Sequence, residues 1–464
     1  MPHYQVLVCN GLLLTMEPQQ PEYFHGWLAI GADGRIAALG AGDPEQGSQA
    51  EELVDAAGSF IAPGFVSGHS HLFTSGLRGI ASDQPLYGWG REMARYISQL
   101  DTEDVYWLTL HGSLDYLDNG VTTAYDFTDS RQPFSVGTDG QTEHADFLRP
   151  QEYLEAQLQA KLDAGIRFVN SFHLDQEVGT HADVLNRADA FVSWVHRLGP
   201  RPMLAALALS GAVQWSERPE SARVEVEMMA RHGLLNQAHF LETAEQVELQ
   251  RSKFDWYEQA GALGPDLIFG HFVQATPDIA RRAGSAGCGM CWQPSANGRL
   301  GSGVADIHGL LSAGLHVGIG LDDQACTDIA DPFGNLRIGL FSQRAARQRT
   351  DAMSVAEVLS LHTTGSASIL HLENQVGSLA VGKWADFLVV NPADPDTGPL
   401  WNPLATYALA CGLRNLKRVY VGGKLVSAEG RSTHPQALET RRKVHLRMQR
   451  IRDGLGLDSP QAHE

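Results

Sequence analysis

The sequence predicts an α/β protein in which a parallel (β/α)8 barrel is joined to a small β-sandwich built by both termini. Three observations lead to this prediction. Short apolar segments of strand length alternate with helical segments from about residue 60 to residue 322. Eight such strands occur, and each is followed by enough chain for a helical crossover. Strand-like alternation with turns recurs near both ends of the chain, outside the alternating region.

The eight barrel strands and their helices can be assigned in order. The predicted strands are residues 61–67, 121–126, 167–173, 203–209, 234–239, 267–271, 289–292 and 315–320. Segments between them repeat apolar residues every three or four positions, as in 102–120. The sequence TAEQ at 243–246 has the pattern of a capping box, so we expect a helix to begin there. An open doubly wound sheet is the alternative, but no Gly-rich phosphate loop follows the first strand.

The remaining segments define the domain organisation. Residues 1–58 and 373–430 alternate in strand fashion, and we expect them to pair as the two parts of the β-sandwich. The barrel would then occupy residues 59–372. A C-terminal helix and tail is expected at 431–464, and the basic residues of its helix fit a solvated face.

Composition and charge limit the partners of the protein. Its 464 residues contain 35 Lys and Arg against 54 Asp and Glu, so the net charge is −19. An acidic chain of this kind disfavours nucleic acid and anionic membranes as partners. No segment reaches the roughly 20 apolar residues of a membrane helix, and the amino-terminal segment lacks a basic leader. Five scattered cysteines indicate a reducing compartment. We therefore expect a cytoplasmic homo-oligomer, a dimer or larger, that acts on a small molecule.

Five residues that could bind a metal fall at the ends of predicted strands. His69 and His71 follow the first strand two residues apart, so in an extended chain both side chains point to one side. His239 ends the fifth strand, His271 ends the sixth, and Asp322 follows the eighth. Barrel enzymes build their active sites on this carboxyl-terminal face. A single histidine there is usually structural, but five such residues together favour a metal site.

The residue types indicate hydrolytic chemistry. Imidazoles with a carboxylate suit zinc, and also cobalt or iron, as a divalent ion that activates water. Glu242, three residues after His239, is placed to protonate a leaving nitrogen or to orient the substrate. A second metal often needs a bridging lysine, and none occurs near the end of the fourth strand in LAALALSGAVQW. The sequence therefore favours one metal ion per chain.

These motifs, with others in the same order, resemble the metal-dependent amidohydrolase superfamily over nearly the whole chain. The matching segments are IAPGFVSGHSHLF, GVTTAYDF, HFLE, GHFV, QPSANGRLGSG, GIGLDD and VGSLAVGKWADFLVVN. The resemblance implies a TIM barrel with a small β-sandwich. It also implies metal binding by His69, His71, His239 and Asp322, polarisation of water or substrate by His271, and proton transfer by Asp322.

Within the superfamily, the chain is similar to the branch of mononuclear aminohydrolases and triazine hydrolases, which includes S-adenosylhomocysteine, guanine and pterin deaminases. The segment LRGIASDQPLYGWGREM is especially similar to the nucleoside deaminases. Three departures count against a polar nucleoside. Ser210 replaces the histidine of a Gly-Pro-His segment, Ser98 stands where a substrate-binding acid is expected, and Trp292 with Gln293 replaces His-Asn.

These departures predict a fairly apolar substrate. The expected substrate-binding residues are Trp89, His173, Ser210, Trp292 and Asn297. We expect hydrolysis of a non-peptide C–N bond in a urea, carbamate or thiocarbamate, as in molinate hydrolase and the phenylurea hydrolases, and hence a role in herbicide degradation. The alternative is deamination or dechlorination of a nitrogen heterocycle such as a purine, pterin or triazine. A non-catalytic binding protein is a third interpretation, and the complete ligand set weighs against it.

Overall fold

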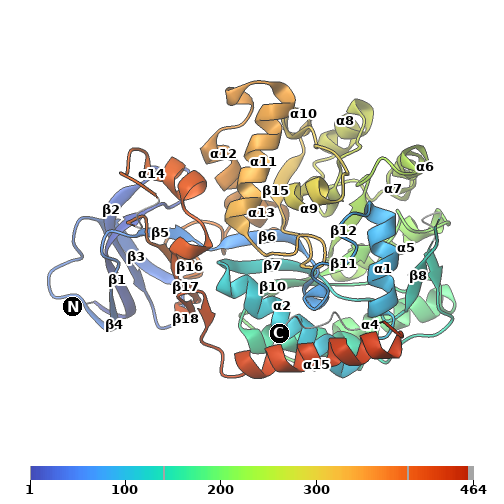
Figure 1. Ribbon diagram of the computed structural model, residues 1–464. Helices are drawn as coiled ribbons and strands as arrows, with labels where there is room; N and C mark the ends of the chain where they lie inside the picture. Colours follow the sequence, from blue (N-terminus) through green and yellow to red (C-terminus); the bar gives the residue numbers. More distant parts are fainter. Residues whose placement is uncertain (1, 139–141, 394–396, 458–464) are drawn as a thin grey trace.

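Eight parallel strands form a nearly closed ring, and a separate sheet from both ends of the chain stands beside it (Figure 1). This computed structural model describes residues 2–138, 142–393 and 397–457. The predicted (β/α)8 barrel is confirmed. Its strands, in chain order and in order around the ring, are β6 (Phe65–Ser70), β7 (Val121–Phe127), β10 (Arg167–Phe172), β11 (Leu204–Gly211), β12 (Leu235–Phe240), β13 (Leu267–His271), β14 (Gly289–Trp292) and β15 (His316–Ile319).

The ring closes where β15 meets β6. Ser70 and Asp322 form a parallel bridge, and the Asp322 backbone N–H donates to the His69 carbonyl oxygen over 3.0 Å. Gly320 permits this approach, because a Cβ atom there would lie 2.6 Å from the Cβ of His69. Closure therefore brings Asp322, from the end of the chain's last barrel strand, next to the histidines that follow the first.

The single strand predicted at 61–67 is two strands that serve different sheets. Strand β5 (Phe60–Pro63) pairs with strands of the terminal sheet, whereas β6 belongs to the barrel. Gly64 separates them, and a Cβ there would lie 2.1 Å from the Thr122 hydroxyl oxygen. Strand β5 therefore belongs to the terminal sheet, although it lies after the expected domain boundary between residues 58 and 59. The sequence does not reveal this division, because both strands are fully buried and so form one continuous apolar segment.

Helices and short turns surround the ring. Those between or beside barrel strands are η1 (Leu72–Thr74), α1 (Leu86–Ile97), α2 (Thr102–Asp118), α3 (Glu152–Ala164), α4 (His181–Arg197), α5 (Glu220–His232), α6 (Val247–Ser252), α7 (Phe254–Ala260), α8 (Pro277–Ser285), α9 (Pro294–Arg299), α10 (Ile307–Ser312), α11 (Pro332–Arg347), η2 (Thr350–Ala352), α12 (Val355–Ser360), the π-helical turn η3 (Leu361–Gly365) and α13 (Ser366–Ile369). Helix α15 (Ala437–Gly454) runs alongside α2 (Figure 1). The tail residues 458–464 lie outside the described part of the chain.

The capping box expected at 243–246 does not form. Thr243 Oγ1 accepts a hydrogen bond from the backbone N–H of Glu245 over 3.3 Å, and helix α6 begins only at Val247. The residue before the helix, Gln246, has a left-handed backbone with φ of 52°. A short Ser/Thr turn therefore replaces the predicted cap.

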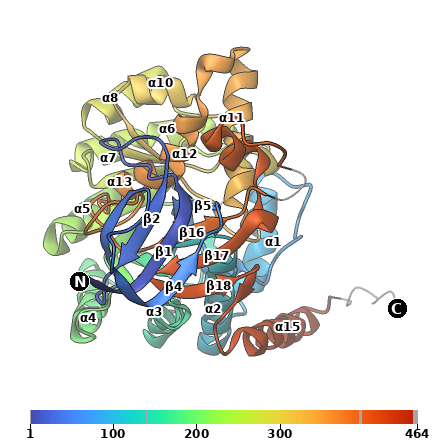
Figure 2. The ribbon, with the colours of Figure 1, turned by 90° about the vertical axis from the view of Figure 1, so that its left-hand side faces the viewer.

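The terminal sheet joins the two ends of the chain, as predicted. It contains β1 (His3–Leu13), β2 (Phe24–Ile30), β3 (Ile36–Ala41), β4 (Gln49–Asp55), β5, β16 (Phe387–Val390), β17 (Leu416–Val421), β18 (Lys424–Ala428) and β19 (Arg431–Ser432). Two turns, α14 (Pro403–Ala405) and η4 (Thr406–Ala410), lie between β16 and β17, followed by η5 (Leu413–Asn415). Figure 2 shows the amino-terminal strands beside the carboxyl-terminal ones. Strand β5 links the two groups by pairing with β1 and with β16.

A buried ion pair connects the terminal sheet to the barrel. The Arg167 guanidinium at the start of β10 donates to both carboxylate oxygens of Asp386, over 2.8 and 3.0 Å. The exposed fractions of the two side chains are 0% and 3%. Asp386 also accepts from the backbone N–H of Gly422 over 2.7 Å. The bidentate geometry fixes the orientation of the two units where they meet.

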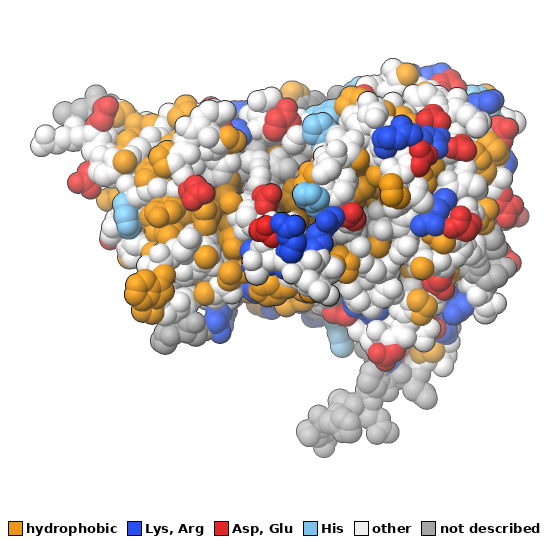
Figure 3. All heavy atoms as spheres, turned by 90° about the horizontal axis from the view of Figure 1, so that it is seen from above, with side chains coloured by type: hydrophobic (Ala, Val, Ile, Leu, Met, Phe, Trp, Pro, Cys, Tyr) orange, Lys and Arg blue, Asp and Glu red, His pale blue; other side chains and the backbone are white. Residues whose placement is uncertain are grey.

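A short hairpin of β8 (Phe134–Val136) and β9 (Thr142–His144) follows β7. On the face seen in Figure 3, basic side chains lie among acidic ones, and hydrophobic side chains gather towards the terminal sheet. Within the described residues, no helix combines the length and the hydropathy needed to cross a membrane.

The connecting ion pair yields a stability prediction. Asp386→Ala leaves the Arg167 guanidinium buried without its carboxylate, so the free energy of unfolding should fall by about 3–5 kcal/mol. Asp351→Ala is the control, because it breaks an Arg349–Asp351 pair whose side chains are 69% and 67% exposed. Its effect should stay below about 1 kcal/mol. Denaturant titration measures both, and equal small losses would contradict the role of the buried pair.

Candidate active site

Three imidazole nitrogens and a carboxylate converge at the carboxyl ends of β6, β12 and β15. The Nε2 atom of His71 lies 3.2 Å from that of His69 and 3.0 Å from that of His239. Asp322 Oδ1 lies 3.5 Å from His69 Nε2 and 3.7 Å from His71 Nε2. Nitrogens this close repel one another unless a proton or a cation lies between them. This set of nitrogen and carboxylate donors is the one that zinc and related ions prefer.

A neighbouring amide prepares His69 to bind a cation. Gln237 Nε2 donates to the Gly68 carbonyl oxygen over 2.9 Å, so its Oε1 atom is the acceptor that lies 2.6 Å from His69 Nδ1. His69 therefore carries its proton on Nδ1 and directs the Nε2 lone pair at the cluster. Such second hydrogen bonds fix the tautomer and orientation of metal-binding histidines.

The other histidines are neutral and supported by an aromatic ring. Burial lowers the pKa of His71 and His239 well below the usual value, as ligation by a neutral imidazole requires. Phe127, at the end of β7, lies under all three rings, with centroids 4.6 Å from His69, 4.9 Å from His71 and 4.5 Å from His239. The three histidine rings therefore pack against one apolar aromatic side chain.

The histidine loop, which runs from His69 at the end of β6 to Leu72, is held by a buried ion pair. Asp126, on β7, accepts from the Leu72 backbone N–H over 2.9 Å and forms a very short contact with the Lys161 ammonium. The exposed fractions of the Lys161 and Asp126 side chains are 0% and 1%. Burial raises the pKa of the Asp126 carboxyl and lowers that of Lys161, which makes each group dependent on the other.

His271, which ends β13, lies beside the cluster and close to Asp322. Its Nε2 atom lies 3.9 Å from Asp322 Oδ2, and its backbone N–H donates to Gln293 Oε1 over 2.9 Å. Asn297 Nδ2 lies 2.9 Å from His271 Nδ1, so in this amide orientation Nε2 carries the proton. His271 and Asp322 both have left-handed backbones, with φ of 65° and 67°. Non-glycine residues in this conformation concentrate at functional sites.

Glu242 lies beside the cluster as a buried acid. Its Oε1 atom is 3.5 Å from His271 Nδ1, and the residue is 2% exposed. Burial, and then the charges of Asp322 and Asp323, raise the pKa of Glu242 well above its usual value. The backbone before it is fixed by Gln214, which accepts from the Leu241 N–H over 2.8 Å. A buried carboxyl with a raised pKa beside the cluster is placed to act as a general acid.

A cavity of about 220 Å³ opens onto this cluster. Three of the predicted substrate-binding residues line it: Trp89, His173 and Ser210. Trp89 Nε1 donates to the Ala325 carbonyl oxygen over 3.1 Å, and the hydroxyl oxygens of Ser210 and Ser171 are 2.7 Å apart. Burial lowers the pKa of His173 to about 4.

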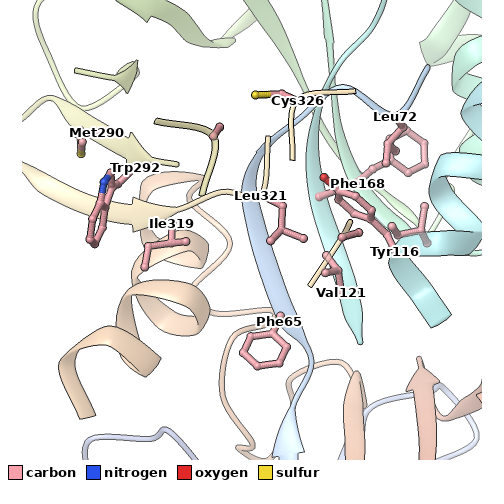
Figure 4. Packing of buried hydrophobic residues seen from close by; sticks show 14 of the residues in the cluster. Phe65, Leu72, Tyr116, Val121, Phe168, Met290, Trp292, Ile319, Leu321 and Cys326 are labelled. Carbon is pink, nitrogen blue, oxygen red and sulfur yellow. The ribbon is translucent and has the colours of Figure 1, made fainter. Parts of the chain in front are cut away.

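Two residues predicted to bind substrate do not line this cavity. Trp292 is 1% exposed and packs in the hydrophobic core, where Figure 4 shows it near Ile319. It faces helix α11, since a Cβ on Gly339 would lie 3.0 Å from its ring. Alternation along β14 turns this side chain away from the ring interior. Asn297 contacts His271 and thereby acts one step away from the cavity.

Sequence reasoning missed several contributors. Gln237 is two residues before His239 on the same strand, so the alternation that placed His239 could have found it. Asp323 follows Asp322 directly and lines the cavity. The partnership of Lys161 with Asp126 joins residues 35 positions apart, and no local pattern signals it.

Comparison with known proteins places this geometry in context. A zinc-bound adenosine deaminase from Xanthomonas campestris has the same fold, with 19% identity, coverage of 97% of this chain and 99% of that chain, and a TM-score of 0.82. The zinc complex of atrazine chlorohydrolase from Arthrobacter aurescens matches with 19% identity, 96% and 100% coverage, and a TM-score of 0.82. Fold and site together define a metal-dependent barrel hydrolase.

The family follows from the sequence comparison. The model of the amidohydrolase family matches residues 60–426, and the chain belongs to that family. It is a metal-dependent amidohydrolase, an enzyme that hydrolyses C–N bonds. The 5-methylthioadenosine/S-adenosylhomocysteine deaminase of Syntrophobacter fumaroxidans is 26% identical over 434 residues, which are 92% of this chain and 93% of the relative. The enzyme of that name from Bacillus cereus is 26% identical over 433 residues, or 91% and 93% of the two chains.

The buried ion pair behind the histidine loop gives a testable prediction. Lys161→Met leaves the Asp126 carboxylate buried and unpaired, which should loosen the Leu72 contact and weaken metal binding by about 10–100-fold. Lys161→Met combined with Asp126→Asn should recover most of the affinity, because an amide oxygen still accepts from Leu72 without a buried charge. Chelator competition measures both. Lys417→Met is the control, at a surface Lys417–Glu429 pair whose side chains are 26% and 69% exposed. Unchanged affinity in the single variant would contradict this support.

Proposed function

We propose that this protein is a mononuclear aminohydrolase that replaces an amino or chloro substituent of a nitrogen heterocycle with oxygen from water. The observation that carries the proposal is Glu242, a buried carboxyl with a raised pKa that lies 3.5 Å from His271 at the edge of the cluster. In deamination, water adds to a ring carbon, the C–N bond to the amino group breaks, and the amino group leaves as ammonia after gaining one proton from that water.

His69, His71, His239 and Asp322 would hold one divalent ion, with zinc as the first choice and cobalt or iron as alternatives. When bound, the ion supplies a water of lowered pKa and a positive charge beside the reacting carbon. The described cavity wall contains no lysine that could bridge a second ion, which supports one ion per chain.

The residues of the chain divide the proton transfers between them. Glu242 donates its proton to the ring nitrogen next to the reacting carbon, which makes that carbon electrophilic. Asp322 Oδ2, on the side of the carboxylate near His271, accepts one proton of the attacking water and passes it to the leaving nitrogen. As the C–N bond breaks, the second proton of that water restores the Glu242 carboxyl, and the ring nitrogen keeps the proton that it received. When the leaving group is chloride, it departs as the anion and Asp322 releases its proton to solvent. The His271 Nε2–H donates a hydrogen bond to the attacking oxygen. Each group lies in the cluster before the substrate arrives, so little reorganisation is needed.

This chemistry distinguishes a heterocycle from a urea or carbamate. A C=N bond must receive a proton on nitrogen as the carbon is attacked, and Glu242 provides one. A urea carbonyl instead develops charge on oxygen. The deaminase relatives, and the chlorohydrolase among proteins of the same fold, support the heterocycle rather than the urea, carbamate or thiocarbamate that we expected from the sequence. That expectation also relied on Trp292, which is buried in the core.

The role of Glu242 can be tested apart from metal binding. Glu242→Gln removes the acidic proton but keeps the shape, so turnover should fall by about 10²–10⁴-fold with metal content unchanged. Elemental analysis and steady-state kinetics measure the two quantities. Glu248→Gln, on the exposed face of α6, is the control. A Glu242 variant with near-normal turnover would show that its carboxyl does not transfer a proton.

The substrate class needs a separate test. The purified protein is incubated with aminopurine nucleosides, aminopterins and amino- or chlorotriazines, and in parallel with N-aryl ureas and thiocarbamates. We expect release of ammonia or chloride from one of the heterocycles. Release of an amine from a urea or thiocarbamate, with every heterocycle left intact, would overturn the proposal.

A further inference from the structure

We propose that the substrate carries no carboxylate or phosphate, and that Asp175 selects substrates with an amine or another N–H donor remote from the reacting carbon. The inference rests on the proposed function only for the identity of the reacting ring. It concerns the wall of the cavity beyond the cluster, formed by α1, the β8–β9 hairpin and the loop after β10.

The cavity wall is unsuited to an anion. Its charged residues, in the part of the chain that the structure describes, are all acidic: Asp129, Asp175, Glu177, Glu242, Asp322 and Asp323. No described lysine or arginine lines it. A carboxylate that leaves water needs a cation or several N–H donors to compensate for its lost hydration.

Three of the side-chain N–H donors that line the cavity are already engaged within the protein. Gln132 Nε2 donates to the Ala145 carbonyl oxygen over 2.7 Å, and Trp89 Nε1 donates to that of Ala325 over 3.1 Å. Gln176 Nε2 donates to Ser221 O over 3.4 Å. An anion would have to break such contacts in order to bind.

A nearby arginine is also committed to the protein. Arg149 donates to the carbonyl oxygens of Ile97, Ser98 and Ser130 and pairs with Asp129 at 3.7 Å. Its exposed fraction is 9%. The Arg149 guanidinium therefore balances the charge of Asp129 and hydrogen-bonds the backbone behind the cavity. It does not offer a free pair of N–H groups to a ligand.

Asp175 is different, because it lines the cavity and the Arg131 and Arg187 guanidinium groups act on its carboxylate only from a distance. It is 9% exposed and accepts from the Ser130 hydroxyl over 2.6 Å. Arg187 donates to its backbone oxygen over 2.9 Å, and no ion pair to the carboxylate is found among the described residues. Burial raises the pKa of Asp175 to about 6, so the group is ionised at pH 8. A buried carboxylate of this kind favours an N–H donor as partner.

The residues around Asp175 define the rest of the substrate. Met93 and Ile97 of α1, Phe134 and Val136 of the hairpin, and Leu174 line the same cavity. They suit an apolar linker between the ring and the amine. Of the two compounds in the relatives' name, S-adenosylhomocysteine carries both a remote amine and a carboxylate, and 5-methylthioadenosine carries neither, so neither compound meets both requirements of this wall.

The test compares three ligands that share one aminoheterocycle and one alkyl chain but end in methyl, ammonium or carboxylate. Their affinities for the metal-loaded protein are measured by calorimetry at pH 8. We expect ammonium to bind tightest and carboxylate to bind at least about 10-fold more weakly than methyl. Asp175→Asn, which keeps the Ser130 contact and tolerates the left-handed backbone (φ 51°), should reduce the ammonium-to-methyl ratio by about 10-fold.

The control is Asp351→Asn, since Asp351 is 67% exposed, pairs with Arg349 and does not line the cavity. It should leave both ratios nearly unchanged. The inference would be overturned if the carboxylate ligand bound as tightly as the methyl ligand, or if Asp175→Asn left the ammonium-to-methyl affinity ratio unchanged. Failure of all three ligands to bind would also overturn it. Binding in the expected order without hydrolysis of any heterocycle would contradict the proposed function alone.

Discussion

The hydrogen bond from the Asp322 backbone N–H to the His69 carbonyl oxygen is the contact on which the site depends. It joins the last barrel strand to the first over 3.0 Å, and Gly320 makes the approach sterically possible. The cluster needs this closure because its ligands come from opposite ends of the barrel sequence. The carboxylate lies within 3.7 Å of both histidines only because the strands that carry them are neighbours.

Around this closure, the protein places charge in its interior only with support from neighbouring groups. Lys161 and Asp126 hold the histidine loop, Arg167 and Asp386 hold the terminal sheet, and Gln237 fixes the His69 tautomer. Asp175, Glu242 and Asp323 line the cavity without an ion pair to lysine or arginine among the described residues, so a substrate or an ion can complete them. This division between supported and unsupported charge is a physical basis for separating structural residues from functional ones.

Local sequence patterns predicted the strands and the convergence of the three histidines and Asp322, because both depend on short-range features. Apolar segments of strand length define the ring, and a histidine or aspartate at the end of such a segment must lie on its carboxyl-terminal face. The failures have non-local causes. The segment Phe60–Pro63 pairs with the terminal sheet, because Gly64 lets the chain pass from that sheet into the barrel. Trp292 faces α11, because its position in the alternation of β14 directs its side chain away from the interior of the ring. Lys161 meets Asp126 only after the barrel has formed.

We propose that four residues from three strand ends hold a single ion. Diffraction data collected at the metal absorption edge, together with elemental analysis of the protein as purified, can locate and count that ion. We expect one anomalous peak per chain, within bonding distance of the Nε2 atoms of His69, His71 and His239 and of an Asp322 carboxylate oxygen. Two peaks in the fully active enzyme, or one peak away from these four side chains, would contradict it.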